Sequence, residues 1–159
     1  HLPYPKLALK GLNKIIPKDL NPENKERLTS NFEASITYSR QIGNIYTGSL
    51  YLGLLSLLEQ SQNLKTGDKI GFFSYGSGAV SEIFSGRLVE GYKDMLRSDR
   101  LDIFAQRHNL SVADYEQLFF EEAQLDDTGS TQFNTYQTGP FRLTEISEHQ
   151  RIYKGNQND

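Results

Sequence analysis

The most apolar stretch of the chain predicts a helix in its middle. Leucines occupy most positions from Leu50 to Leu58 and go nearly all the way round the helix that they would form. A helix that is apolar on every side is buried on every side. We therefore expect this helix, capped by Thr47 or Ser49 and ending near Gln60, to be the buried centre of the fold.

A pair of strands is predicted after this helix. A turn over residues 65–69 leads into residues 70–75, a short apolar run with aromatic side chains that is typical of a central strand. The Gly-Ser-Gly turn at 76–78 then reverses the chain. Residues 79–89 predict the second strand, in which Gly86 favours a bulge.

Two helices are predicted before the leucine-rich helix. Residues 6–16 carry apolar side chains at roughly helical spacing, and Pro17 ends this helix. Asn21 and Pro22 suit the N-cap and the first position of a second helix. We expect it to run to about Gln41 and, because most of its faces are polar, to lie at the surface.

The last third of the chain is more polar. Residues 91–107 predict mixed helical structure, and a serine that suits an N-cap starts a helix over 112–123. Residues 125–140 are rich in Asp, Thr, Gln and Gly and predict a mobile loop. Residues 141–146 and 150–153 predict two closing antiparallel strands.

Composition narrows the class of protein. The 159 residues are 36% hydrophobic, with a mean hydropathy of -0.58, which suits one globular domain with a core. The longest apolar run is far shorter than the roughly 18 residues of a membrane span. The net charge is -3 without a basic stripe, so we expect neither a membrane nor a nucleic acid as partner.

The absence of cysteine excludes some chemistry within this chain. It rules out disulfides, thiolate metal sites and a cysteine nucleophile, and it fits a cytoplasmic protein. No metal-ligand spacing appears among the acidic residues, so we expect no metal and no cofactor. Because the first residue is not methionine, we expect a piece of a longer protein.

The histidines differ in their surroundings. His108 and His149 stand among polar residues with no partner at ligand spacing, so we interpret both as surface residues. His1 precedes a segment with prolines at 3 and 5, which restrict the backbone. On the residues alone, a functional role for His1 is left open.

Two polar side chains stand at the ends of apolar elements. Asn44 precedes the leucine-rich helix, and Ser77 follows the predicted central strand. Polar groups at the tips of buried elements are candidates for a site. The Gly-Ser-Gly turn lacks both the P-loop pattern and the G-x-G-x-x-G fingerprint, so neither nucleotide-binding motif is present.

Three motifs together carry a family resemblance. They are HLPYPK at 1–6, GNIYTGS at 43–49 and FSYGSGAV at 73–80. In this order they resemble the C-terminal part of bacterial 3-hydroxy-3-methylglutaryl-CoA (HMG-CoA) synthase, closely up to about Tyr92 and more loosely from Lys93. The order of His, Gly-Asn and Gly-x-Gly is more distantly similar to ketoacyl-carrier-protein synthase III of the same superfamily.

The resemblance implies an α/β fold over residues 1–159, the C-terminal half of a thiolase-like layered fold with a buried central helix on a mixed sheet. It implies part of a cytoplasmic, homodimeric enzyme of the mevalonate pathway. This family condenses acetyl-CoA with acetoacetyl-CoA through an acetyl-cysteine. The cysteine and a proton-removing glutamate lie in its N-terminal part, so we expect this chain alone to be inactive.

The resemblance also implies site residues. His1 matches the catalytic histidine, which stabilises the alkoxide formed on acetoacetyl-CoA. Asn44 and Ser77 match groups that hold the acyl substrate. Lys6 and Lys10 match lysines that contact CoA, and their i, i+4 spacing places them on one helix face; on the residues alone they would be solvated charges.

Two other classes of function stay open at this point. The chain could be a non-catalytic thiolase-like module that binds acyl-CoA or a protein. It could also be a relative of ketoacyl synthase III, although the helix over 21–41 lengthens the gap between His1 and Asn44 and the Tyr-Thr-Gly-Ser wording favours HMG-CoA synthase.

Overall fold

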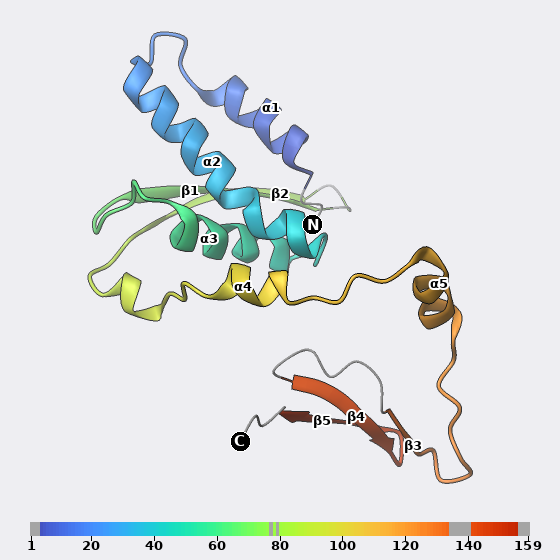
Figure 1. The fold of residues 1–159 in the computed structure, drawn as a ribbon. Helices are drawn as coiled ribbons and strands as arrows, with labels where there is room; N and C mark the ends of the chain where they lie inside the picture. Colours follow the sequence, from blue (N-terminus) through green and yellow to red (C-terminus); the bar gives the residue numbers. More distant parts are fainter. Residues whose placement is uncertain (1–3, 77, 79, 134–140, 156–159) are drawn as a thin grey trace. The chain divides into compact units, whose positions relative to one another are not determined.

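The computed structural model describes residues 4–76, 78, 80–133 and 141–155, which form an α/β chain of two compact units, His1–Ser98 and Asp99–Asp159 (Figure 1). The first unit contains α1 (Pro5–Ile15), α2 (Pro22–Ile42), α3 (Gly48–Gln60), β1 (Lys69–Gly76), β2 (Val80–Arg87) and the 3-10 turn η1 (Tyr92–Met95). The second contains α4 (Arg100–Ala105), α5 (Val112–Phe120), β3 (Thr131–Gln132), β4 (Phe141–Ser147) and β5 (Gln150–Gly155).

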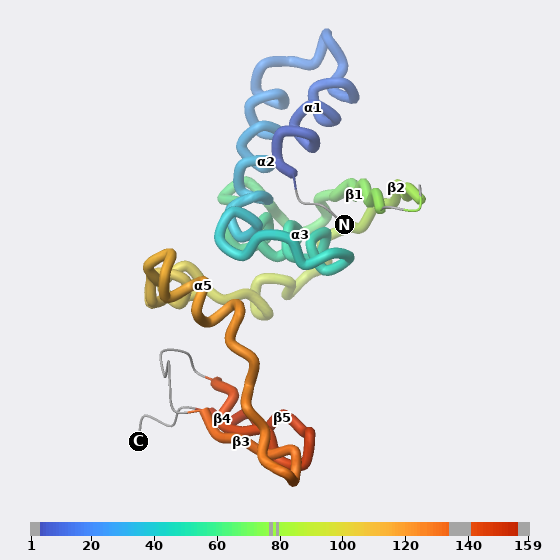
Figure 2. The backbone as a smooth tube through the Cα atoms, turned by 90° about the vertical axis from the view of Figure 1, so that its right-hand side faces the viewer, coloured from blue at the N-terminus to red at the C-terminus, as the bar shows by residue number. Residues whose placement is uncertain are grey.

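The first two helices begin and end where the local sequence predicts. Ile16, the residue before Pro17, is extended, because a proline disfavours helical backbone in its predecessor. Asn21 caps α2 by accepting a 2.8 Å hydrogen bond from Asn24 N, with Pro22 at the first helical position. The two helices run side by side in both views (Figures 1 and 2).

Small residues bring α2 and α3 together. Ser56 is fully buried, donates to Ala34 O at 2.6 Å and accepts from Tyr38 N at 3.2 Å. A Cβ at Gly53 would lie 3.5 Å from Ser35 O, which is ordinary contact and leaves little room for a larger side chain. The hydroxyl of one helix thus bonds the backbone of the other.

A polar network closes the same interface. Tyr38 is only 1% exposed, and its hydroxyl donates to Glu59 Oε2 at 2.6 Å and accepts from Gln60 Nε2 at 3.1 Å. Glu59 Oε1 also accepts from Arg97 N at 3.0 Å. The carboxylate of Glu59 therefore ties α2 and α3 to the end of the first unit.

The prediction that the leucine-rich helix is buried on every side is wrong within this chain. Ser49 and Ser56 are the buried residues of α3, while its leucines are half-buried and Tyr51 is 58% exposed. Among the described elements, α2 makes the extensive contact with α3. A helix that is apolar all round has too few neighbours here to cover every side.

The two predicted strands form an antiparallel hairpin beside α3 (Figures 1 and 2). Phe72 and Phe84 face each other in register and stack at 4.8 Å on the half-buried face. The pairing continues without interruption through Ile70 and Gly86, so the predicted bulge is absent. Because β1 pairs only with β2 in the described residues, it is not a central strand within this chain.

The second unit contains a three-stranded antiparallel sheet in the order β3-β4-β5. The two closing strands are confirmed, with a bulge between Leu143 and Glu145. The α/β class is confirmed too, but the described strands pair antiparallel in both sheets, so the described residues form no mixed sheet among themselves. No described helix is long and apolar enough to cross a bilayer.

Two details of the second unit differ from the sequence prediction. The helix after Ser111 is confirmed, with Ser111 Oγ accepting from Asp114 N at 3.1 Å, but it ends at Phe120 instead of running to Ala123. Within the loop predicted over 125–140, residues 131–132 pair with β4 as β3. Residues 134–140 lie outside the described part of the chain.

Candidate functional site

A tight turn between α2 and α3 fixes Asn44. Gly43 has φ +81 and ψ -154, a backbone conformation that favours glycine. Asn44 Oδ1 then accepts a 2.8 Å hydrogen bond from Tyr46 N, which closes an Asx turn. Tyr46 itself has φ +53, which costs a non-glycine residue roughly 1–2 kcal/mol.

Ser49 supports this turn from within α3. Ser49 is only 8% exposed, and its Oγ accepts a hydrogen bond from Ile45 N at 3.1 Å. The same hydroxyl donates to Asn44 Oδ1 at a long 3.4 Å. Ser49 therefore bonds both the backbone and the side chain of the turn. Of the two predicted caps, Thr47 does stand at the N-cap position of α3, but its side chain makes no capping hydrogen bond.

The arrangement leaves the amide nitrogen of Asn44 as a donor. Two donors occupy Oδ1, and among the described residues no hydrogen-bond partner of Nδ2 is found. Asn44 is exposed, so a bound molecule could reach it. An amide N–H donates to a carbonyl oxygen without changing its own charge, as the prediction for Asn44 requires.

The described structure does not place the other predicted site residues next to Asn44. Lys6 and Lys10 are exposed on α1, one helical turn apart, and no hydrogen bond in the described residues joins them to the Asn44 turn. His1 and Ser77 lie outside the described residues. The described structure therefore places Asn44 in a defined geometry, and leaves the roles of His1, Ser77, Lys6 and Lys10 as predictions.

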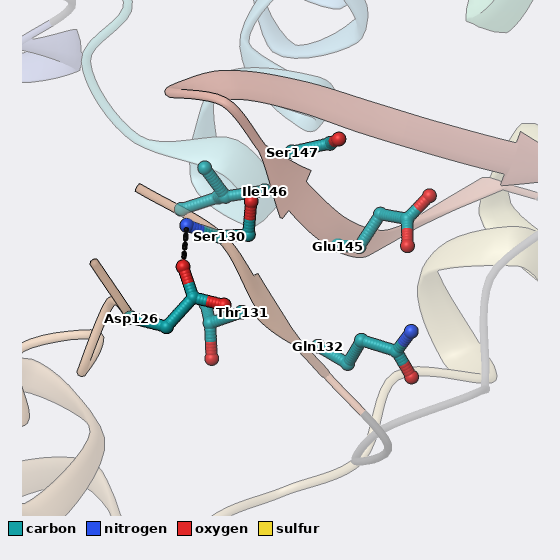
Figure 3. A pocket seen from close by; sticks show the side chains of 7 residues that line it. All are labelled: Asp126, Ser130, Thr131, Gln132, Glu145, Ile146 and Ser147. Atoms are coloured by element: carbon teal, nitrogen blue, oxygen red, sulfur yellow. Dashed lines mark hydrogen bonds between the residues drawn. The ribbon is translucent and has the colours of Figure 1, made fainter. Parts of the chain in front are cut away.

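A separate polar hollow lies in the second unit. It has a volume of about 170 Å³ and is lined by side chains of the turn before β3, of β3 and of β4 (Figure 3). Asp126 Oδ1 accepts there from the Thr128 hydroxyl at 2.7 Å and from the backbone N–H groups of Thr128 and Ser130, both at 2.9 Å. The hydroxyl bond, followed by the Ser130 backbone bond, holds the pKa of Asp126 below its ordinary value of 3.8.

The polar groups of this hollow stabilise the local turn and do not indicate a binding site. None of its lining residues is a predicted site residue. Within the described ranges there is no group of three or more His, Asp or Glu placed to hold a metal ion. The bonds to Asp126 are all accounted for by the turn that it stabilises.

His108 and His149 are exposed, which confirms their interpretation as surface residues. His149 and Glu148 form the turn between β4 and β5, with φ values of +65 and +48. His149 N donates to Gly129 O at 3.0 Å, and a Cβ on Gly129 would collide with the imidazole ring. His149 thus packs this hairpin on the Asp126 turn.

Comparison with known proteins identifies the family. A family model described as hydroxymethylglutaryl-coenzyme A synthase C terminal matches residues 6–155. The chain is 48% identical over 127 residues to the hydroxymethylglutaryl-CoA synthase of Enterococcus faecalis, covering 79% of this chain and 33% of that protein. It is 31% identical over 157 residues to the human mitochondrial enzyme of that name, covering 89% of this chain and 30% of that protein.

Solved structures agree. A crystal structure of an HMG-CoA synthase complexed with CoA matches 95% of this chain and 39% of its own, with 66% identity and a TM-score of 0.81. The structure of smu.943c from Streptococcus mutans matches 98% of this chain and 41% of its own, with 62% identity and a TM-score of 0.80.

The fold and these neighbours define a protein of the thiolase-like α/β class. The chain spans about a third of the length of the curated relatives that it matches. It belongs to the hydroxymethylglutaryl-CoA synthase family and corresponds to the C-terminal part of that family's proteins.

Sequence reasoning did not assign a role in the site to Ser49, which it considered only as a helix cap. The available signal was a pair of serines, Ser49 and Ser56, spaced seven residues apart in an otherwise apolar helix. A buried polar group needs a partner. Both serines are indeed bonded to backbone outside α3, and Ser49 is bonded to Asn44 as well.

Proposed function

We propose that this chain is the C-terminal part of an HMG-CoA synthase. That enzyme condenses acetyl-CoA with acetoacetyl-CoA and water to give 3-hydroxy-3-methylglutaryl-CoA and CoA. The observation that carries the proposal is the likeness to the solved synthase complexed with CoA, at 66% identity over 95% of this chain. The two solved structures compared above, each more than 60% identical to this chain, align with both of its units.

The chemistry divides between two parts of the protein. A cysteine and a glutamate of the N-terminal part would carry the acetyl group and remove a proton from its methyl, since this chain contains no cysteine. The carbanion then attacks the ketone carbon of acetoacetyl-CoA. His1 would donate to the ketone oxygen as it becomes an alkoxide, and Asn44 Nδ2 would donate to the acyl carbonyl.

The other predicted residues would bind the substrates. Ser77 would lie at the acyl group, and Lys6 and Lys10 would meet the phosphates of CoA with their positive charges. The CoA thioesters are substrates, so the proposal needs no cofactor. The homodimer, the mevalonate pathway and the cytoplasmic location implied by the resemblance remain predictions.

A chimera tests the proposal. This chain replaces the matching C-terminal segment of the solved CoA-bound synthase, and release of CoA thiol is measured with acetyl-CoA and acetoacetyl-CoA. We expect turnover within about tenfold of the host enzyme, because 66% of the aligned residues are identical. The host without its C-terminal segment, and this chain alone, are the controls and should show no turnover.

The result that contradicts the proposal is equally specific. A chimera that unfolds cooperatively near the temperature of the host, binds a CoA thioester, but forms no 3-hydroxy-3-methylglutaryl-CoA would favour a non-catalytic acyl-CoA-binding module. Turnover with malonyl thioesters in place of acetoacetyl-CoA would favour a ketoacyl synthase.

A further inference from the structure

We propose that Ser49 is a positioning residue, whose buried hydroxyl holds the Asn44 amide with its oxygen occupied and its nitrogen left to donate to substrate. This inference rests on the proposed function, because it assigns Ser49 a part in the role of Asn44. It concerns a residue that touches neither the substrate nor the reacting atoms.

The first argument is the burial of Ser49. At 8% exposure, a serine hydroxyl has lost most of its contact with water and must be bonded within the protein. It accepts from Ile45 N at 3.1 Å and donates to Asn44 Oδ1 at 3.4 Å. The bond from Ile45 N fixes where the hydroxyl oxygen lies, and the hydroxyl proton is then directed toward Asn44 Oδ1.

The second argument is the state of the asparagine. Asn44 is exposed, and a free side chain in water would sample several rotamers and both orientations of its amide. Donors from Tyr46 N and Ser49 Oγ both meet Oδ1. Turning the amide round would place its N–H₂ group against two donors, so this orientation is selected before substrate arrives.

The third argument is the strain in the turn. The Asx bond from Asn44 coincides with the left-handed backbone of Tyr46. Such strain persists only where the surroundings compensate for it. The Ser49 bond to Ile45 N supplies a second bond across the turn, between residues 45 and 49, so the first turn of α3 holds it in place.

The test uses the active chimera, or the intact synthase that contains this chain. Ser49→Ala should lower the rate of condensation about five- to tenfold, as expected for the loss of the hydroxyl that bonds both Ile45 N and the Asn44 amide. Formation of the acetyl-enzyme, measured by CoA release without acetoacetyl-CoA, should change less than twofold. Ser49→Cys keeps the shape of the side chain with a slightly larger atom that bonds weakly, and it should show the same loss.

Ser56→Ala is the matched control. Ser56 is a buried serine on the same helix, it also bonds backbone of another element, and its hydroxyl bonds are to Ala34 O and Tyr38 N rather than to Asn44. We expect it to lower the melting temperature as much as Ser49→Ala without selectively lowering condensation. An equal loss of both steps in the two variants would make Ser49 merely structural and overturn the proposal.

A double-mutant cycle with Asn44→Ala separates the possible failures. If Ser49 acts through Asn44, then Ser49→Ala lowers condensation no further once Asn44 has been removed. A further five- to tenfold loss in the double variant would show independent action and overturn the proposal. If Asn44→Ala affects condensation but Ser49→Ala does not, only the Ser49 inference fails; if Asn44→Ala has no effect, the proposed role of Asn44 fails first.

Discussion

At the scale of single residues, non-glycine residues adopt left-handed backbone in two of the described turns. Tyr46, Glu148 and His149 are non-glycine residues with positive φ among those described. Each costs roughly 1–2 kcal/mol, so neighbouring contacts must compensate. At Tyr46 the compensation is the Asn44 side chain, and at His149 it is packing on Gly129.

Gly129 should therefore tolerate alanine poorly. Its φ of +75 strains an alanine, and the new methyl would collide with the His149 ring. Because the exposed His149 ring can turn aside, we expect the Gly129→Ala variant to lose about 1 to 3 kcal/mol of local stability, seen as faster hydrogen exchange in peptides covering 126–132 and 147–151.

Gly67→Ala is the control for this prediction. Gly67 has φ +90, but a Cβ there would meet nothing within 4 Å, so only the backbone cost of about 1 kcal/mol should appear in its own turn. Equal losses at the two glycines would show that the contact with His149 contributes nothing.

His1→Ala tests the histidine role that the family resemblance implies. In the intact synthase we expect condensation to fall about 100-fold or more, because a general acid contributes at least that much. Acetylation of the cysteine, which occurs before the ketone is attacked, should fall much less. His108→Ala, at an exposed histidine, should leave both rates unchanged. Equal losses of both steps after His1→Ala would exclude a role confined to the alkoxide.

At the scale of elements, surfaces of α1 and the hairpin lack partners in the described chain. On α1, Lys6 and Lys10 are exposed on one face, together with the apolar Leu7 and Ile15 on others. On the hairpin, Phe73 and Ile83 face each other across β1 and β2 and are 63% and 80% exposed. Aromatic and branched residues paired in this way normally lie against another layer.

Replacing Lys6 and Lys10 together by alanine should weaken binding of both CoA thioesters. Because both lysines are exposed and solvent screens their charge, we expect only a three- to tenfold rise in KM, with kcat nearly unchanged. Lys25→Ala, on the exposed side of α2, is the control. A KM equal to that of the control would make the two lysines ordinary solvated charges.

At the scale of the whole molecule, the chain buries little apolar surface by itself. The buried hydrophobic side chains among the described residues are Ile36, Tyr38, Leu64 and Leu88. A chain of this length normally buries a larger core. The chain spans about a third of its curated relatives, and we expect the remaining length to cover the half-buried leucines of α3 and the exposed face of the hairpin.

The isolated chain should therefore bind a hydrophobic dye such as ANS and self-associate, whereas the folded chimera should do neither. Size-exclusion chromatography and dye fluorescence measure both properties at equal molar concentration. A monomeric chain that unfolds cooperatively without binding dye would show that its own core suffices.

Much of the local structure followed from the sequence. The cap at Asn21, the proline that ends α1, the cap at Ser111 and the hairpin strands depend on residues a few positions apart, so local patterns predict them. The order of three motifs likewise pointed to the family that the comparisons confirm. Asn44 was found because a polar residue at the tip of an apolar helix is unusual.

Only the tertiary structure decided burial and orientation. The leucines of α3 predicted burial on all sides, but burial depends on which elements cover a helix, and α2 alone packs extensively on it among those described. The role of Ser49 depends on where its hydroxyl points, which follows from the backbone path through Gly43 and Tyr46. The sequence therefore determined which residues could form a site, and the path of the backbone decided how Asn44 is held.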